Sequence, residues 1–335
     1  MSFSITSRQS AEPQFHFREE IPILFQVLEI VEANASCPAS TLYSTFETGR
    51  HGSRKSRTID APCPQLKAVQ RALLDKILCM VSPHEAAMAF CPGRSIAMNA
   101  RLHHGAPHLF TTDIRSFFPS IRTHHLREML DLRFPHLSAE VRAEITRIVT
   151  RDGQLPQGAP TSPHLANLVM ASFDGLCEEA ASSAGALYTR YADDICITAQ
   201  DAVSLRRLEH VVRMGLAALG MEMHPEKTRH LGPNQTRLVT GLDIGGARLR
   251  PTKAFRKKTA ALVRMAVKYP EKMQRQRQRI RGYLAFWHDV DADDPHLREL
   301  LLQMGFSRWA GQAMDRAEIT RTDPSAVSNA AGPGA

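Results

Sequence analysis

Two adjacent acidic residues lie between two runs that alternate apolar and polar residues as β-strands do. Residues 186 to 199 read ALYTRYADDICITA, so Asp193 and Asp194 fall where the chain must turn back. Two strands separated by such a short interval form an antiparallel hairpin. The pattern therefore predicts a hairpin that presents two neighbouring carboxylates at its tip.

A third carboxylate ends another predicted strand. Residues 108 to 121 read HLFTTDIRSFFPSI, in which Asp113 follows a short apolar run and Pro119 closes the next turn. Together with Asp193 and Asp194, Asp113 would form a cage of hard oxygen ligands that suits Mg²⁺. Two such ions activate a hydroxyl and stabilise a leaving pyrophosphate, so the residues indicate nucleotidyl transfer. The alternative is an Asp-Asp pair in an ordinary surface turn.

The order of predicted elements indicates an α+β fold. The strand that ends at Asp113 is followed by helices near 122–132 and 138–151 and by a long helix whose first turn holds Ser162. Two strands then flank the acidic turn, and a helix near 201–220 and a short strand pair near 226–244 follow. This is the order of a ferredoxin-like sheet. Upstream, residues 42–62 predict a basic hairpin, and 16–32 and 65–81 predict amphipathic helices.

The chain is basic, with 42 Lys and Arg against 34 Asp and Glu and a formal charge of +8. Such a chain attracts phosphate backbones, so nucleic acid is the first expected partner. Residues 251–290 are predicted to be helical and carry the densest cations, among them Lys257, Lys258, Arg275 and Arg279. We expect these helices to contact phosphates, with a merely solvated face as the alternative.

The expected cellular compartment follows from the membrane-span and signal patterns that the sequence lacks. No stretch approaches a membrane span, and the first residues carry no signal pattern, so we expect a cytoplasmic protein without a membrane partner. The six cysteines include no Cys-x-x-Cys pair, so neither a zinc site nor a disulfide framework is expected.

The motifs occur in the order found in reverse transcriptases, and the chain resembles that family. Besides Tyr191-Ala192-Asp193-Asp194, the matching segments are Arg57-Thr58-Ile59, Asp113-Ile114-Arg115-Ser116-Phe117-Phe118, Gln157-Gly158-Ala159-Pro160-Thr161-Ser162-Pro163 and His224-Pro225-Glu226-Lys227-Thr228. The resemblance implies a right-hand polymerase with fingers, a ferredoxin-like palm and a helical thumb. It implies fingers and palm at residues 41–245 and a thumb at 246–320. An N-terminal helical extension at 1–40 and a disordered tail at 321–335 complete the expected organisation.

The same resemblance implies roles for individual residues. The three aspartates would hold two Mg²⁺ ions, with the backbone carbonyl of Ile114 as a further ligand. Contacts with the incoming dNTP are implied for Arg57, Phe118, Gln157, Gly158 and Lys227. Arg57 would bind the triphosphate, Phe118 would exclude a ribose 2′-hydroxyl, and Lys227 would assist the leaving pyrophosphate. The alternatives are a solvated basic turn, core packing and an exposed lysine without a function, respectively.

Two further segments resemble signatures of retron reverse transcriptases. They are Asn99-Ala100-Arg101-Leu102-His103 and Val239-Thr240-Gly241. In that family they help to engage a structured noncoding RNA, so RNA contact is implied for Asn99, His103, Val239, Thr240 and Gly241. Asn99 and His103 are spaced i, i+4 and would share one helix face, where a buried polar pair is the alternative. For residues 239–241 the alternative is a strand that ends in glycine.

The retron resemblance implies a specific activity. Such a protein copies its own noncoding RNA from a guanosine 2′-hydroxyl into branched, RNA-linked multicopy single-stranded DNA, and guards bacteria against phage with a separate effector protein. Intron-encoded relatives continue beyond the thumb, whereas this chain stops soon after Trp309. A group II intron-like or other defence-associated reverse transcriptase is the alternative. An RNA-binding scaffold without polymerase activity is the alternative from a different class.

Overall fold

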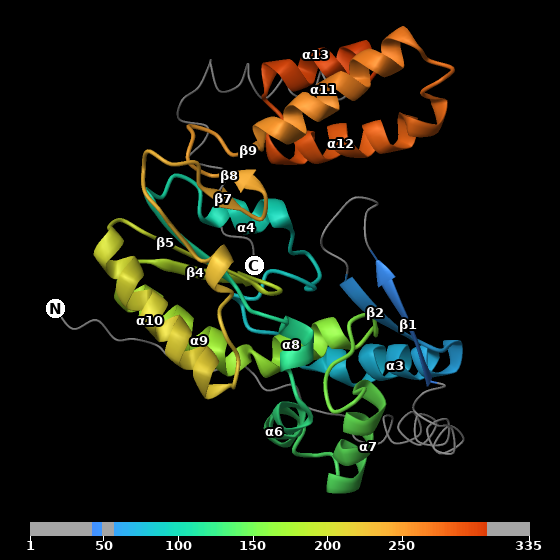
Figure 1. The fold of residues 1–335 in the computed structure, drawn as a ribbon, viewed down its shortest axis with the longest axis vertical. Helices are drawn as coiled ribbons and strands as arrows, with labels where there is room; N and C mark the ends of the chain where they lie inside the picture. The colour runs from blue at the N-terminus through green and yellow to red at the C-terminus, as the bar shows by residue number, and fades with distance from the viewer. Residues whose placement is uncertain (1–41, 49–56, 307–335) are drawn as a thin grey trace, which may run out of the picture. The chain divides into compact units, whose positions relative to one another are not determined.

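The computed structural model describes residues 42–48 and 57–306 (Figure 1). The chain divides into two compact units. The first comprises Met1–Ser82 and Phe118–Val169, and the second comprises Pro83–Phe117 and Met170–Ala335. The helix predicted for 16–32 and the tail predicted for 321–335 lie outside the described residues, and the predicted boundaries of fingers, palm and thumb stay predictions.

The first unit begins with an antiparallel hairpin of β1 (Tyr43–Thr48) and β2 (Arg57–Pro62), which confirms the hairpin predicted for 42–62. Helix α3 (Pro64–Lys76) follows at once, since the fixed φ of proline suits a first helical turn. It ends earlier than the predicted residue 81, because Ile77 leaves the helical conformation and a 3₁₀ turn, η1 (Leu78–Met80), follows.

The other helices of the first unit are α6 (Thr123–Arg133), α7 (Ala139–Val149) and α8 (Ser162–Val169). They agree with the helices predicted near 122–132 and 138–151. The short helix α5 (Phe117–Ser120) begins on the last residue of the second unit's first segment. The single long helix predicted from Ser162 is in fact two, because Met170 separates α8 from α9 (Ala171–Ser183) with ψ near −4°.

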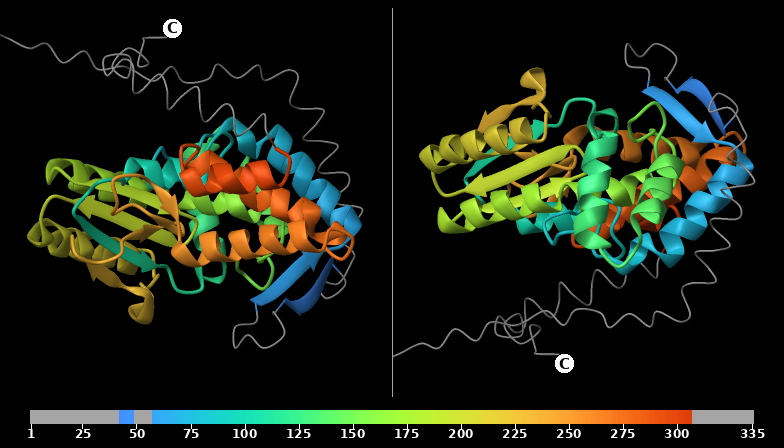
Figure 2. Two further views of the ribbon diagram at one scale, coloured as in Figure 1. Left: turned by 90° about the horizontal axis from the view of Figure 1, so that it is seen from above. Right: turned by 90° about the horizontal axis from the view of Figure 1, so that it is seen from below.

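The second unit is built on a four-stranded antiparallel sheet. Its strands are β3 (His108–Asp113), β4 (Leu187–Tyr191), β5 (Asp194–Ala199) and β6 (Arg229–Leu231), in the order β4-β5-β3-β6. This is the strand order of a ferredoxin-like sheet, as predicted. Helices α9 and α10 (Ala202–Ala218) lie side by side along one face (Figures 1 and 2).

The opposite face of this sheet carries α4 (Ile96–Leu102) and a small sheet of β7 (Leu238–Val239), β8 (Leu242–Asp243) and β9 (Arg250–Pro251). Leu109 and Cys196 of the large sheet are buried in one cluster with Ala100 and Val239. The strand pair predicted for 226–244 therefore belongs to two sheets. β6 completes the large sheet after the 3₁₀ turn η2 (Pro225–Lys227), and β7 pairs with β8 in the small one.

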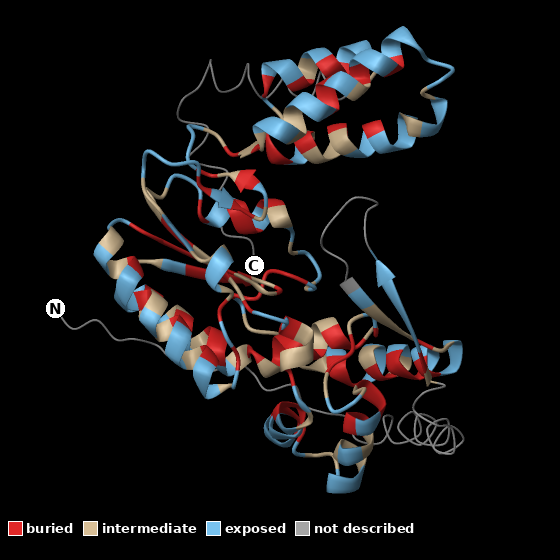
Figure 3. Ribbon diagram, viewed as in Figure 1, coloured by how far each residue is buried: buried red, intermediate tan, exposed pale blue. Residues whose placement is uncertain are grey.

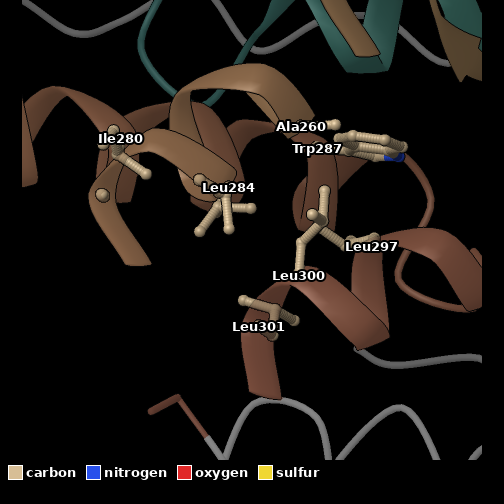
Figure 4. Packing of buried hydrophobic residues seen from close by; sticks show 9 residues of the cluster. Ala260, Ile280, Leu284, Trp287, Leu297, Leu300 and Leu301 are labelled. Carbon is tan, nitrogen blue, oxygen red and sulfur yellow. The ribbon is translucent and has the colours of Figure 1, made fainter. Parts of the chain in front are cut away.

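Three helices close the described part of the chain, and the first two confirm the helical prediction within 251–290. They are α11 (Lys253–Lys268), α12 (Arg277–Val290), preceded by η3 (Gln274–Gln276), and α13 (Pro295–Gln303). Their buried stripes face one another, and their outer surfaces are exposed (Figure 3). The shared core contains Trp287, Leu284 and Leu300 (Figure 4). Burial of such large apolar side chains supplies most of the stability of a small helical unit.

Within the described residues, no helix is long and apolar enough to cross a membrane. The cysteines in this part of the chain, Cys63, Cys79, Cys91, Cys177 and Cys196, are free thiols.

Candidate active site

The acidic hairpin predicted from the sequence turns in two residues. Tyr191 pairs with Asp194, so Ala192 and Asp193 alone form the loop between β4 and β5. Ala192 has a φ of +59°, whereas Asp193 is not among the described residues with positive φ, and these signs match a type II′ turn. Glycine is usual at the first loop position of that turn. The chain therefore holds an alanine in a strained conformation beside its two acidic residues.

The structure brings the third predicted carboxylate to the same turn. Asp113 is the Cα partner of Asp194 in the register of β3 and β5. The next residue, Ile114, donates its amide hydrogen to the carbonyl of Asp193 at 2.9 Å, and the carbonyl of Asp113 accepts from the amide of His224 at 2.7 Å. Asp113, distant in sequence, thus lies at the same end of the sheet as Asp193 and Asp194.

The electrostatics of this site favour a cation. Burial raises the pKa of Asp194 above its ordinary value, because desolvation penalises the charged form. The side chain of Asp113 is only 13% exposed and forms an ion pair with the ammonium of Lys227, which is 40% exposed. Lys227 therefore lies at the carboxylates rather than on an isolated stretch of surface.

The chemistry of the donor set fits a divalent ion. Carboxylate and carbonyl oxygens are the ligands that Mg²⁺ prefers, and that ion usually keeps several of its waters. In residues 42–48 and 57–306, no three His, Cys, Asp or Glu side chains stand close enough together to hold a metal ion. Asp113 and Asp194 are opposed as a pair, and the predicted three-carboxylate cage is not formed in this conformation.

A pocket of about 320 Å³ opens beside the carboxylates. Asp113, Tyr191 and Asp194 of the large sheet line one part of it, and Ile96, Thr240 and Gly241 line another. The Thr240 hydroxyl donates to the Ile96 carbonyl at 2.8 Å and joins these segments. The volume lies at the lower end of the range for small-ligand sites. The Val-Thr-Gly segment and the start of α4 therefore border the candidate active site.

Asn99 of α4 and His103, the residue that follows this helix, are both fully buried. The His103 ring contacts both β4 and β5, with Nδ1 2.8 Å from the Thr198 hydroxyl and Nε2 2.7 Å from the Thr189 hydroxyl. Burial lowers the pKa of His103 to about 4. Neither side-chain polar atom of Asn99 has a hydrogen-bond partner among the described residues. These contacts of His103 match the alternative interpretation, a buried polar residue that braces the structure. Neither Asn99 nor His103 is exposed to RNA in this structure.

The predicted nucleotide loop lies in the first unit, against β2. The carbonyl of Gln157 accepts from the amide of Asp60 at 2.8 Å. Gly158 has a φ of +134°, and a Cβ at this position would stand 2.9 Å from the carbonyl oxygen of Asp60. Only glycine permits both this conformation and this approach. Arg57 begins the same strand, and its side chain is outside the described part of the chain.

Two neighbouring phenylalanines have different surroundings. Phe117 is 5% exposed, and its ring centre lies 5.8 Å from the guanidinium carbon of Arg190. Phe118 is partly exposed. Phe117 packs in the core, whereas for Phe118 both the gate and the core-packing alternative stay predictions.

The predicted cations of the C-terminal helices, Lys257, Lys258, Arg275 and Arg279, are all exposed. Arg279 donates to the Tyr283 hydroxyl at 3.0 Å, and the Lys258 ammonium lies 5.5 Å from the centre of that ring. The contact of Tyr283 with these cations was not predicted, although its i, i+4 spacing from Arg279 is visible in the sequence. A second pocket, of about 270 Å³, is lined by Lys253, Arg256, Lys257, Ala260, Arg264 and His296. These helices thus offer a concave cationic surface suited to phosphate.

Comparison with known proteins agrees with this geometry. Residues 49–244 match the family described as reverse transcriptase (RNA-dependent DNA polymerase). The Retron Mx162 reverse transcriptase of Myxococcus xanthus is 32% identical, over 72% of this chain and 56% of that protein. The Retron Ec86 reverse transcriptase of Escherichia coli is 34% identical, over 60% of this chain and 63% of that protein. The matched region thus spans less than two thirds of each relative.

Among solved structures, apo telomerase from Candida tropicalis, truncated from its C-terminal domain, matches 69% of this chain and 60% of that one, with a TM-score of 0.46 and 12% identity. The family match covers more than half of the chain, and the curated relatives are retron enzymes. The chain belongs to the reverse transcriptase (RNA-dependent DNA polymerase) family and is of the retron type.

Proposed function

We propose that the protein is an RNA-directed DNA polymerase that copies an RNA template with dNTPs. One observation supports this more than any other: Asp113 stands opposite Asp194, at the base of the turn that carries Asp193, in a chain of the reverse transcriptase family. An RNA-binding scaffold would not require Asp113 to lie opposite the acidic turn.

Asp113, Asp193 and Asp194 would hold Mg²⁺, with the backbone carbonyl of Ile114 as a further ligand. A divalent ion bound there supplies activation of the attacking hydroxyl and neutralises charge on the pyrophosphate. Lys227, already paired with Asp113, would place its ammonium near the leaving pyrophosphate. In the first unit, Arg57 would bind the triphosphate, Gln157 and Gly158 would support the nucleotide, and Phe118 would exclude a 2′-hydroxyl.

We also propose the retron reaction for this chain. The protein would copy its cognate noncoding RNA from a guanosine 2′-hydroxyl into branched, RNA-linked multicopy single-stranded DNA. It would act in the cytoplasm, with a separate effector, in defence against phage. The support is the similarity to two retron reverse transcriptases and the two signature segments.

The RNA would meet two exposed regions. The cationic surface of α11 to α13 would bind phosphates through Lys257, Lys258, Arg275 and Arg279, contacts that position the RNA without selecting its sequence. Thr240 and Gly241 would contact RNA at the pocket beside the carboxylates. Asn99, His103 and Val239 would support this contact from the core, since all three are buried.

The test is to express the gene with its flanking DNA and to extract nucleic acid. The retron proposal predicts a short DNA that stays joined to RNA until a debranching enzyme releases it. Unbranched DNA, or synthesis only with an added primer, would favour a group II intron-like or other defence-associated reverse transcriptase. RNA bound without any DNA product would favour the scaffold.

A further inference from the structure

A buried ion pair lies behind the acidic turn. The side chains of Arg190 on β4 and Asp174 on α9 are both 0% exposed. They meet through two hydrogen bonds, from Arg190 Nη2 to Asp174 Oδ2 at 2.6 Å and from Nε to Oδ1 at 2.8 Å. The Tyr188 hydroxyl also donates to Asp174 Oδ1, at 2.8 Å. The guanidinium is therefore fixed in position and orientation.

A further donor of the same guanidinium reaches the turn itself. Arg190 Nη1 donates to the carbonyl oxygen of Ala192 at 3.0 Å. Ala192 is the residue with the strained φ of +59°, and the peptide that follows it leads to Asp193. The backbone of Arg190 is held as well, because its amide donates to Ala86 at 2.8 Å and its carbonyl accepts from Met88 at 2.7 Å. Arg190 thus ties the turn to a rigid part of the second unit.

Arg190 cannot contact substrate from this position. Side chains alternate along a strand, so Tyr188 and Arg190 point toward α9, while Tyr191 faces the pocket with Asp113 and Asp194. Arg190 acts on the carboxylates through the backbone of the turn, and it also lies against the Phe117 ring.

Stability alone does not explain the pair. A buried ion pair costs desolvation, and apolar residues of similar volume often replace one without loss of stability. Apolar residues would, however, leave the Ala192 carbonyl without its side-chain donor. The strained turn would then be free to relax.

We propose that Arg190, oriented by Asp174, is a positioning residue that holds the Ala192 peptide in its left-handed conformation and thereby sets where the carboxylates of Asp193 and Asp194 stand. This rests on the proposed polymerase function. A displacement of catalytic groups by about 1 Å costs on the order of 100-fold in rate, so a single hydrogen bond at the turn has a large expected effect.

The test replaces both charges at once, as Arg190→Met with Asp174→Leu, so that no lone charge stays buried. We expect a folded protein with a modestly lower melting temperature, because the buried Tyr188 hydroxyl loses its acceptor. Its kcat should be about 100-fold lower, with a nearly unchanged KM for dNTP and a higher Mg²⁺ requirement. Adding Ala192→Gly should restore part of the kcat, because glycine adopts positive φ without strain. Arg190→Lys should lose activity too, since a lysine lacks the fork that serves both partners.

Asp201→Ala is the control. Asp201 caps α10 by accepting from the amides of Val203 and Ser204, and it follows the end of β5 opposite to the turn. This variant should be less stable with an unchanged kcat. The proposal would be overturned if the double variant Arg190→Met, Asp174→Leu kept the wild-type kcat and Mg²⁺ requirement. It would also be overturned if the loss of kcat followed the loss of melting temperature in every variant and Ala192→Gly restored none of it.

Failure of the polymerase function would look different. If the wild type itself makes no DNA on an RNA template, that function fails, and the shift of melting temperature with added Mg²⁺ still tests the positioning. A smaller Mg²⁺-induced shift in the double variant Arg190→Met, Asp174→Leu than in the wild type would support the proposal, and equal shifts would overturn it.

Discussion

Asp113 lies directly opposite Asp194 in the antiparallel register of β3 and β5, and the residue after Asp113 donates its amide hydrogen to the turn that carries Asp193. Main-chain hydrogen bonds therefore hold the end of β3 against the acidic turn. Side-chain changes at the turn should alter the chemistry more than the fold.

Phe118→Ala should let the enzyme accept ribonucleotides. The partly exposed ring is proposed to exclude the 2′-hydroxyl, so its removal should lower the discrimination between dNTP and NTP by tenfold or more, about 1.4 kcal/mol in the barrier. Single-nucleotide incorporation kinetics measure this ratio. Phe117→Leu, at the buried neighbour, should lower the melting temperature without changing the ratio. An alanine variant that still rejects ribonucleotides would contradict the gate.

Gly158→Ala should separate the nucleotide loop from β2. The added Cβ would stand 2.9 Å from the Asp60 carbonyl oxygen, so overpacking of about 1–3 kcal/mol adds to the strain of positive φ. The KM for dNTP should rise and the melting temperature should fall.

Gly153→Ala is the matched control for this change. Gly153 has a φ of +74°, but the nearest heavy atom to its added Cβ, the Thr123 hydroxyl oxygen, is 3.7 Å away. This variant carries the strain without the collision. Equal melting temperatures and equal KM values for the two alanine variants would contradict the close approach at Gly158.

His103 should make the protein less stable in mild acid. Its pKa is about 4 in the folded state against an ordinary value of 6.5, so the unfolded state binds the proton more readily. Stability should therefore fall as pH falls from about 6.5 to about 4, by about 2 kcal/mol between pH 7 and pH 5. Urea unfolding at both pH values gives this difference. His103→Leu should reduce it, whereas His104→Gln, at the exposed neighbour, should retain it. The same pH dependence in all three proteins would refute the prediction.

The cations around Tyr283 should contribute to RNA affinity through phosphates. Replacing Lys258 and Arg279 with Met should reduce the slope of log K against log salt by about 1.5, since each phosphate contact contributes about 0.7–0.9. Filter binding of a structured RNA at several salt concentrations measures the slope. Arg206→Met with Arg207→Met, at exposed positions of α10, serves as the control and should leave it unchanged. Equal slopes for the two double variants would contradict a specific role for these helices.

Local patterns predicted most of the elements and the hairpin at Asp193, because strand alternation and a two-residue turn are encoded by neighbouring residues. The split between β6 and β7 was not predictable in this way, since it depends on pairing with β3 and β8. The break at Met170 carries no glycine or proline signal. Spacing alone also does not show which face of α4 is buried. The sequence could therefore not decide whether Asn99 and His103 contact RNA or form a buried polar pair. The contact between Arg190 and Asp174 joins residues 16 positions apart on different elements, which no local pattern reveals.

The most direct measurement is Mg²⁺-dependent DNA synthesis on an RNA template by the wild type and by Asp193→Asn with Asp194→Asn. The amides keep the size of the side chains but lose the charge that holds a metal ion. We predict synthesis by the wild type and none by the variant, with equal RNA affinity for both. Synthesis that persists in the variant would contradict the assignment of these carboxylates to the reaction.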